Sequence, residues 1–275
     1  MRPHYQPRSS RAGIRGLVQG EFSGLVIALG IIAMWSASIA LGLAGVHPGA
    51  GAPVADGAWV LVSTFLSTGM FITAHECMHG LVVPGRPRVN RALGWFATWS
   101  YAGMDYAALE RAHHRHHAVP ATEDDPDFHR GKPGLLFWYV DFMVQYFTLR
   151  QYLWLNLVVG VMIFGLALPV ERVLIFWALP LVLSTFQLFV VGTWLPHRPG
   201  AYRGDGPLRA RSLEWSPLWS FVACYHFGYH FEHHARPDLP WWRLWRVRQM
   251  SESELAAYRP HCASAGAIER PSLGQ

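Results

Sequence analysis

Long apolar runs separated by short polar stretches dominate the chain, and four of these runs are long enough to cross a lipid bilayer. A membrane-spanning helix needs about 20 residues at roughly 1.5 Å each. The four runs cover residues 23–46, 58–79, 152–170 and 173–196. The pattern therefore predicts an all-α integral membrane protein with four spans, the last one kinked at Pro180 because proline lacks a backbone N–H.

Two further apolar stretches are shorter and are interrupted by polar side chains. Residues 92–109 include Asp105, and residues 135–149 include Asp141 and Gln145. A charged side chain is costly inside the hydrocarbon layer. We therefore expect these two stretches to form helices at the membrane interface rather than spans.

Basic residues are distributed asymmetrically between the two faces that this layout defines. With the N-terminus inside, the outer loops are residues 47–57 and 170–172, and of the 23 Lys and Arg residues only Arg172 lies in them. Basic residues accumulate on the cytoplasmic side of membrane proteins. We expect a multi-pass protein of the bacterial inner membrane with both termini cytoplasmic. It would comprise an N-terminal segment (1–22), a membrane domain (23–250) and a C-terminal tail (251–275).

The composition agrees with a membrane protein and excludes several other classes. Hydrophobic residues make up 51% of the 275 positions and charged residues 15%, against roughly 25% charged in soluble domains. The cytoplasmic loops account for the net charge of +5, so we expect no nucleic-acid partner. The three cysteines are far apart and form no CxxC, which predicts neither a disulfide framework nor a cysteine metal site.

Nine histidines recur at helical spacing near the predicted cytoplasmic ends of the spans. Histidines three or four positions apart share one face of a helix, and neutral imidazoles in such a set can bind iron, zinc, copper or nickel. A mononuclear site needs only about three or four protein ligands, so nine candidates indicate two metal ions. They are His75, His79, His113, His116, His117, His197, His230, His233 and His234.

Other polar residues lie close to these nine. His226 extends the face of the last histidine group back by one turn, so we expect it to support the ligands from outside. Asp124, Asp125 and Asp127 follow the second group and have two interpretations: they orient ligating histidines, or they belong to a solvated turn around Pro126. His114 lies off the shared face of its group, and His4, His47, His129 and His261 are interpreted as ordinary surface or interior residues.

Two other classes of protein are compatible with part of this pattern. "HECMH" at residues 75–79 matches H-E-x-x-H, in which two histidines bind zinc and the glutamate acts as base, but an intramembrane zinc protease would leave the other histidine groups unexplained. A metal transporter should place polar residues along a path through the membrane. The spans hold few such residues, Asn156 and Gln187 among them.

The arrangement HxxxH, HxxHH and HxxHH resembles the integral-membrane fatty-acid desaturase and hydroxylase superfamily. Within it, the stretches "HECMHG", "HHRHHAVPATEDDPDF", "GTWLPHRPG" and "HFGYHFEHHARPDLPWWRL" are similar to the bacterial β-carotene 4-ketolases. The resemblance covers about residues 20–250. The histidine pattern is highly specific for the superfamily, and the longer stretches are moderately specific for the ketolases.

The resemblance implies a desaturase-like fold with a non-haem site for two iron ions that uses O₂ as cosubstrate. The nine histidines would be the iron ligands. In desaturases an asparagine one turn before the isolated histidine contributes through water; Thr193 occupies that position here, so the match is weak there. Phe231 replaces a histidine that many ketolases carry in the last group.

The implied reaction converts β-carotene through echinenone to canthaxanthin, by two hydroxylations at ring carbon 4 and loss of water, and zeaxanthin to astaxanthin is a further option. A carotenoid hydroxylase and an acyl-lipid desaturase share the same metal site and remain alternatives. The chain has no flavin or nicotinamide motif, so electrons would come from a ferredoxin-like donor. Arg243, Arg246 and Arg248 would steer that donor or, the interpretation we prefer, anchor the chain to lipid headgroups beside neighbouring tryptophans.

Overall fold

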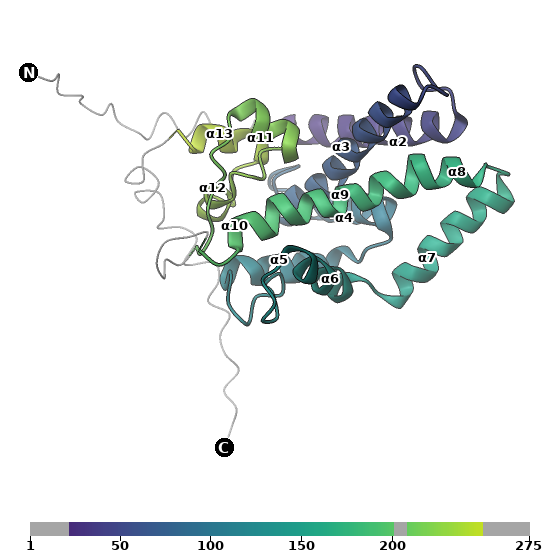
Figure 1. The fold of residues 1–275 in the computed structure, drawn as a ribbon. Coiled ribbons are helices and arrows are strands. Elements are labelled where there is room, and N and C mark those ends of the chain that lie inside the picture. Colours follow the sequence, from purple (N-terminus) through teal and green to yellow (C-terminus); the bar gives the residue numbers. More distant parts are fainter. Residues whose placement is uncertain (1–21, 201–207, 250–275) are drawn as a thin grey trace, which may run out of the picture.

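The computed structural model of the 275-residue chain describes residues 22–200 and 208–249, and every regular element in these ranges is helical. The predicted C-terminal tail and nearly all of the predicted N-terminal segment lie outside the described residues. Figure 1 shows two long antiparallel helices packed against a second set of long helices, with shorter helices gathered at one end. The predicted all-helical membrane fold is confirmed.

Helices α2 (Ser23–Ala44) and α3 (Pro53–Met78) form the first antiparallel pair (Figure 1). Helix α2 is apolar all round but buries only one side, as expected of a helix whose other side faces lipid. It ends where Gly45 adopts a left-handed conformation (φ 69°), which glycine allows without a steric penalty. Helix α3 is mostly buried, because it packs against α2, α4 and α9 and so occupies the centre of the bundle.

The predicted interfacial stretch 92–109 is broken into two helices. Helix α4 (Pro87–Ala102) ends at Gly103, whose positive φ of 65° turns the chain. Helix α5 (Tyr106–Ala118) starts after Asp105, whose carboxylate accepts a hydrogen bond from the Ala108 N–H. The residue that interrupted the apolar pattern is therefore the N-cap of a second helix.

The third predicted span, residues 152–170, corresponds to a helical stretch from Leu149 to Gly165 that follows another helix after a sharp bend. Helix α6 (Leu135–Tyr146) is followed by α7 (Leu149–Gly160), which continues as the π-helix η1 (Val161–Gly165). The two helical stretches meet at an angle of 89°. The hydrophobic pattern already separated residues 135–149 from residues 152–170, but it carries no information on the angle at which the two helical stretches meet.

The last span is one continuous helix of 28 residues, from Val170 to His197. It consists of α8 (Val170–Val173), η2 (Leu174–Ala178), α9 (Leu179–Phe189), η3 (Val190–Trp194) and α10 (Leu195–His197), of which η2 and η3 are π-helical turns. Pro180 follows η2, and the helix runs through it unbroken. A π-helical turn shifts the hydrogen-bond pattern locally, which accommodates the N–H that proline lacks.

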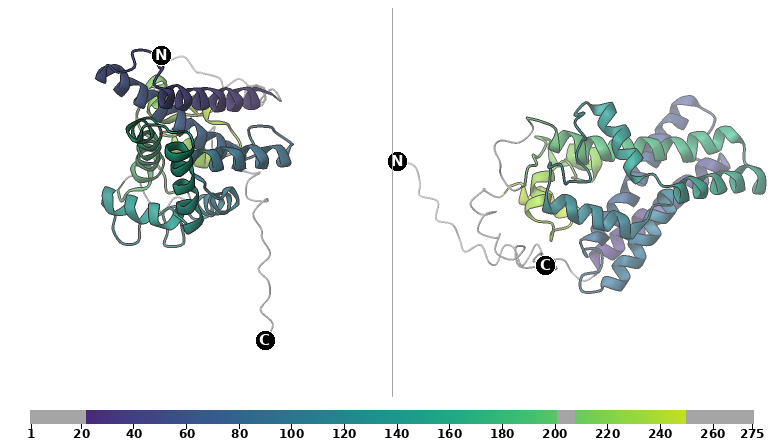
Figure 2. Two further views of the ribbon diagram at one scale, coloured as in Figure 1. Left: turned by 90° about the vertical axis from the view of Figure 1, so that its right-hand side faces the viewer. Right: turned by 90° about the horizontal axis from the view of Figure 1, so that it is seen from below.

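Short elements close the end of the bundle where α3 and the last span finish. They are α11 (Pro217–Cys224), α12 (His230–Ala235), η4 (Trp241–Arg243) and α13 (Leu244–Val247). Figure 2 shows these elements packed together at this end of the molecule. At the opposite end, Arg172 donates hydrogen bonds to the carbonyls of Leu43 (3.4 Å) and Ala44 (2.8 Å) and so joins the last span to the C-terminus of α2.

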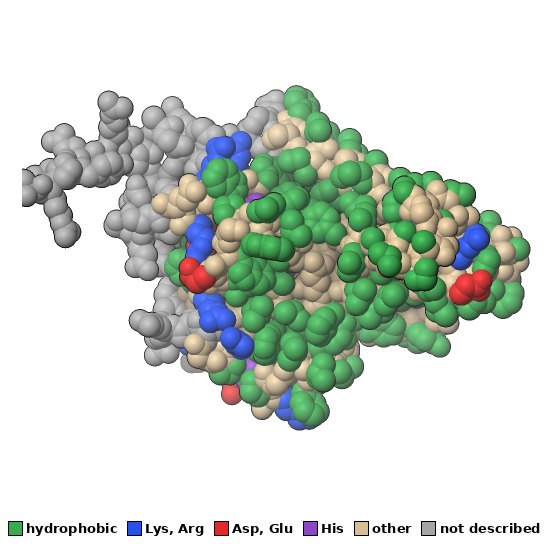
Figure 3. Space-filling model, turned by 45° about the horizontal axis from the view of Figure 1, so that its top comes forward, with side chains coloured by type: hydrophobic (Ala, Val, Ile, Leu, Met, Phe, Trp, Pro, Cys, Tyr) green, Lys and Arg blue, Asp and Glu red, His purple; other side chains and the backbone are tan. Residues whose placement is uncertain are grey.

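Three helices are long and apolar enough to cross a membrane, and the bent α6–α7 pair would be a fourth crossing if it counts as one span. Apolar side chains cover the face seen in Figure 3, while Lys and Arg side chains gather at one end of it. Large apolar residues are exposed on several long helices, among them Val26, Leu61 and Leu174. The chain is a membrane protein whose apolar outer surface faces lipid.

Candidate metal centre

All nine candidate histidines come together in the structure, in two adjacent groups. The nitrogen atoms offered within each group lie within 4.8 Å of one another. One group consists of His75, His79, His113, His117 and His233, and the other of His116, His197, His230 and His234.

Helices α5 and α12 each contribute histidines to both groups. On α5, His113 and His117 are one turn apart and face the first group, while His116 is rotated toward the second. Helix α12 divides in the same way, with His233 in the first group and His230 and His234 in the second. Two helices thus contribute to both groups, which places the two candidate metal positions side by side.

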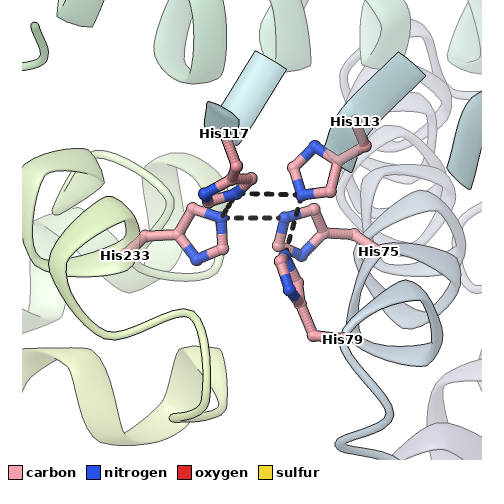
Figure 4. Close-up of side chains that lie close together, drawn as sticks. All are labelled: His75, His79, His113, His117 and His233. Carbon is pink, nitrogen blue, oxygen red and sulfur yellow. Dashed lines mark hydrogen bonds between the residues drawn. The ribbon is translucent and has the colours of Figure 1, made fainter. Parts of the chain in front are cut away.

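The first group directs its Nε2 atoms toward a common centre (Figure 4). The Nε2 atom of His233 lies 3.2 Å from that of His75 and 2.9 Å from that of His117. The Nε2 atom of His113 lies 2.8 Å from that of His79 and 3.1 Å from that of His117. Converging imidazole nitrogens of this kind form a donor set for a transition metal.

The second group is fully buried. The Nε2 atom of His234 lies 3.1 Å from that of His116 and 3.0 Å from that of His230. The Nε2 atom of His197 is buried and has no hydrogen-bond partner among the described residues. A buried polar atom without a partner is costly, and a metal ion would satisfy it.

Three histidines are oriented by an oxygen atom on the other side of the ring. His75 Nδ1 lies 3.3 Å from a carboxylate oxygen of Glu76, and His197 Nδ1 lies 2.9 Å from the Arg209 carbonyl. His116 Nδ1 lies 3.0 and 2.9 Å from the two oxygens of Asp125. Each Nδ1–H donates to its oxygen, which assigns the tautomer whose Nε2 lone pair is free for a metal.

Burial keeps most of these histidines neutral. Desolvation lowers the pKa of His79 to about 3, and it also lowers the pKa values of His113, His117, His230, His233 and His234. Burial also acts to lower the pKa of His116, but the hydrogen bond to Asp125 and the charge of Asp127 outweigh it and raise that pKa. A neutral imidazole has the free lone pair that a metal requires.

Two of the three predicted carboxylates lie at the site. Asp125 is buried beside His116 and also accepts hydrogen bonds from the backbone N–H groups of Ala121 and Asp127, both at 2.8 Å. One oxygen of Asp127 lies 3.9 Å from His116 Nδ1, and the other accepts a hydrogen bond from the Tyr146 hydroxyl. Asp125 therefore fixes both the histidine and the loop that follows α5.

The structure does not bring Asp124 or His226 to the histidines. The Asp124 carboxylate is exposed and pairs with Arg115 at 2.9 Å, so the solvated-turn interpretation holds for this residue. His226 precedes α12 in a left-handed turn (φ 60°), so it does not extend the face of that helix. Its ring stacks on Tyr229 instead, with the ring centroids 5.6 Å apart.

Thr193 lies in the π-helical turn η3, one turn before His197, and lines a cavity of about 250 Å³ that adjoins both histidine groups. The cavity wall is mostly apolar and includes His75, His113, His116 and His230 on one side. Side chains of α3, α4, α6, α7 and α9 line much of the remainder. The arrangement suits an apolar substrate that presents one end to the metal positions.

Arg209 and Tyr146 contribute to the site but were not expected from the sequence. The Arg209 carbonyl orients His197, and the Arg209 guanidinium lies 3.3 Å from the carbonyl of Ala121 in the loop after α5. Tyr146 holds Asp127. Neither residue lies in a histidine motif, so the helical spacing of the histidines could not predict their part in the site.

The structure weakens both non-oxygenase alternatives. His75 and His79 share their site with three histidines from other helices, and Glu76 contacts His75 and the Trp241 N–H, which leaves no two-histidine protease site. For a transporter, the polar Gln187 should face a path, but its amide bonds to Thr68 and the Ala223 carbonyl.

The tryptophan-rich segment after α12 is joined by an ion pair to α12, the helix that carries three of the candidate histidines. Arg248 pairs with Glu232 at 3.0 Å and with the exposed Glu214 at 2.7 Å. The Arg246 guanidinium lies 5.1 Å from the ring centroid of Trp245, a pairing common at membrane interfaces.

Comparisons with known proteins agree with this site. A profile of the family described as "Fatty acid desaturase" matches residues 51–156 and 148–266. A beta-carotene ketolase of Paracoccus sp. strain N81106 is 42% identical over 255 residues, covering 92% of this chain and all of that protein. A beta-carotene ketolase of Paracoccus sp. strain PC1 is 47% identical over 190 residues, covering 68% of this chain and 76% of that protein.

A more distant eukaryotic relative shares the similarity. The zeaxanthin 4-ketolase of Chlamydomonas reinhardtii is 37% identical over 254 residues, covering 87% of this chain and 56% of that protein. The family profile spans the four segments that carry the histidines. The chain therefore belongs to the fatty acid desaturase family, in which it groups with the β-carotene ketolases.

Proposed function

We propose that the protein is a β-carotene 4-ketolase that oxidises ring carbon 4 of the carotenoid to a ketone. The observation that carries this proposal is the nine-histidine centre at the end of an apolar cavity, together with 42% identity to a bacterial beta-carotene ketolase over its whole length. Zeaxanthin is a second candidate substrate, because a relative at 37% identity is a zeaxanthin 4-ketolase.

The nine histidines would hold two iron ions, His75, His79, His113, His117 and His233 on one and His116, His197, His230 and His234 on the other. The donor set fits, because each of the nine imidazoles is either kept neutral by burial or oriented by an oxygen atom that accepts its Nδ1–H. Imidazole also suits iron among other transition metals. When bound, the iron pair would supply the O₂ activation and the oxidising power that side chains alone lack.

The protein itself positions the substrate and protects the site. Carbon 4 is a CH₂ group next to a double bond, so it must be held against the metal positions rather than activated by an acid or base. Each hydroxylation uses one O₂, two electrons and two protons and releases one water, and two of them at carbon 4 give a diol that loses water to form the ketone. The apolar cavity wall excludes bulk water during these steps.

The orienting groups have a defined part in this proposal. Asp125 and Asp127 hold His116, and Glu76 and Arg209 hold His75 and His197. Such outer contacts fix the ring orientation and the tautomer of a ligand. Thr193 occupies the position of the desaturase asparagine and lies on the cavity wall, where its hydroxyl is available to a water molecule.

Electrons would come from a ferredoxin-like donor at the cytoplasmic face. A second hollow reaches His79 and is lined by Arg88, Arg91 and Glu110. Two basic side chains beside a ligand candidate favour an acidic donor. This end of the molecule would lie in the cytoplasm of a bacterial cell, with the protein in the inner membrane and both termini inside, since it carries most of the basic side chains.

Expression in a bacterium that accumulates β-carotene, followed by pigment chromatography, tests the function. Echinenone and canthaxanthin are the expected products. Zeaxanthin alone would assign the protein as a hydroxylase, and unchanged β-carotene with altered membrane lipids would assign it as an acyl-lipid desaturase. Metal analysis of the purified protein should give about two iron ions per chain, and a single zinc ion would contradict the two-iron site.

A further inference from the structure

The cavity beside the histidines reaches the outer surface of the helical bundle. Its other lining residues are buried or half-buried, but Phe147 is 44% exposed and Val182 is 57% exposed. A side chain that lines a cavity and is also exposed lies at its mouth. The mouth is therefore bounded by the α6–α7 bend, where Phe147 lies, and by α9, which carries Val182.

Hydrogen bonds close two of the neighbouring gaps around α9. The Tyr101 hydroxyl on α4 lies 2.7 Å from Ser184 Oγ, and the Tyr139 hydroxyl on α6 lies 2.8 Å from Thr185 Oγ1. Ser184 and Thr185 donate to the carbonyls three residues earlier, so each tyrosine O–H donates to α9. Both tyrosines and Thr185 line the cavity.

No side-chain hydrogen bond joins α7 to α9 within the part of the chain that the structure describes. Leu155 of α7 and Leu181 and Val182 of α9 line the cavity there, and contacts between apolar side chains can part without leaving a polar group unsatisfied. The gap between α7 and α9 is thus the side of the cavity that can admit a molecule from lipid.

The size of the cavity determines how much of a carotenoid it holds. Its volume of about 250 Å³ is below the roughly 300–1,000 Å³ of sites that enclose drug-sized ligands. A forty-carbon carotenoid is longer than such ligands, so one ring and a short part of the polyene fit inside. The remainder must leave through the mouth, where lipid tails are as apolar as the cavity wall.

We propose that the carotenoid enters sideways from the membrane between α7 and α9, with Val182 and Phe147 at the entrance, and that its distal half stays in the lipid during the reaction. This inference rests on the proposed function. The entrance selects for an apolar, narrow chain, and the cavity contacts only the end group that is being oxidised. Oxidation of both ends then requires the half-oxidised product to leave and return with its other end first.

The test compares two tryptophan substitutions that lie one turn apart on α9. Val182→Trp places an indole at the entrance, whereas Leu179→Trp changes a residue one turn earlier that is 42% exposed and does not line the cavity. Initial rates of keto-carotenoid formation are measured in membranes that contain β-carotene. We expect Val182→Trp to lower the rate at least tenfold with unchanged iron content and thermal stability, and Leu179→Trp to match the wild type. Equal rates for the two variants would overturn the proposal.

A photocrosslinking experiment gives a readout that does not depend on turnover. A benzophenone amino acid is incorporated at position 182 or 179, and the membranes are loaded with β-carotene and irradiated. Cross-linking of β-carotene at 182 but not at 179 supports the entrance. Keto-carotenoid formation without cross-linking at 182 overturns the entrance and leaves the proposed function intact, whereas a wild type that forms no keto-carotenoid overturns the proposed function itself.

Discussion

His116 donates its Nδ1–H to the carboxylate of Asp125, whose two oxygens lie 3.0 and 2.9 Å away, and so turns its Nε2 atom toward His234. The pair connects the loop after α5 to the second histidine group. Because Asp125 also accepts two backbone N–H groups, one carboxylate fixes both the ligand candidate and the loop.

Replacing Asp125 by Asn should impair the metal site while preserving the fold. The amide keeps the shape of the side chain but has one acceptor oxygen fewer and no charge. Loss of an outer contact to a ligating histidine typically costs about 10–100-fold in metal affinity or activity, and we expect a loss in this range for iron content and ketolase rate. Asp124→Asn is the matched control, because Asp124 pairs with Arg115 on the surface. Equal losses in both variants would refute an orienting role.

Removing His116 itself should be more damaging than removing a half-buried histidine outside the two groups. His116→Ala takes one of four donors from the second group, and we expect loss of about one iron per chain and a rate lowered by roughly 100-fold or more. The control is His129→Ala. His129 packs against Trp138, with ring centroids 4.9 Å apart, and belongs to neither group. Metal analysis and pigment chromatography decide the outcome, and full iron content in His116→Ala would contradict the proposed ligand set.

Gly192→Ala should disturb the histidines through an aromatic neighbour. An added Cβ would lie 2.4 Å from the Phe227 ring, and that ring packs against His75, His230 and His233 at 4.9, 5.2 and 5.6 Å between centroids. Overpacking of this kind costs about 1–3 kcal/mol, so we expect a lower thermal midpoint and a reduced ketolase rate.

Gly160→Ala is the control for that substitution, because nothing lies within 4 Å of its added Cβ. Alanine favours a helix over glycine by roughly 1 kcal/mol, so the control should be as stable as the wild type or more stable. Thermal unfolding in detergent compares the two variants. A Gly192→Ala protein with the stability and rate of the control would show that Phe227 moves without consequence.

Arg172 should stabilise the end of the bundle opposite the histidines. Its guanidinium donates to the carbonyls of Leu43 and Ala44 at the C-terminus of α2, where a positive charge also favours the helix dipole. Arg172→Gln should lower the free energy of unfolding by about 1–2 kcal/mol without changing iron content. Arg150→Gln removes an exposed pair with Asp105 at 3.2 Å and should cost at most about 1 kcal/mol. A change in iron content in Arg172→Gln would place this residue in the functional site.

The histidine pattern was informative because it is local. His113, His116 and His117 lie on one short helix, and so do His230, His233 and His234, so their spacing already defined which way they point. The division into two groups was not visible in the sequence. It depends on how α5 and α12 are rotated against α3 and α10, and this rotation is set by packing.

Helical spacing predicts the position of a polar neighbour only if that neighbour lies on the same helix as the histidines. His226 was expected on the face of α12, but the chain turns at Tyr225 and His226, both with positive φ, before that helix begins. Asp124 and Asp125 are adjacent in the sequence and have opposite environments, one exposed and one buried. The side chains of a loop follow no regular spacing, so only the tertiary structure shows which of them are buried and which are exposed.

The sequence by itself determined the helical membrane class, the apolar segments and the nine histidines, because hydrophobic length and helical spacing are properties of single helices. The tertiary structure decided the bend of 89° between α6 and α7, the division of the histidines into groups of five and four, and the mouth of the cavity beside α9. These features depend on contacts between residues far apart in the chain, such as His75 and His233. The sequence around His75 or around His233 does not specify that the two side chains meet, because their contact forms only when the helices pack.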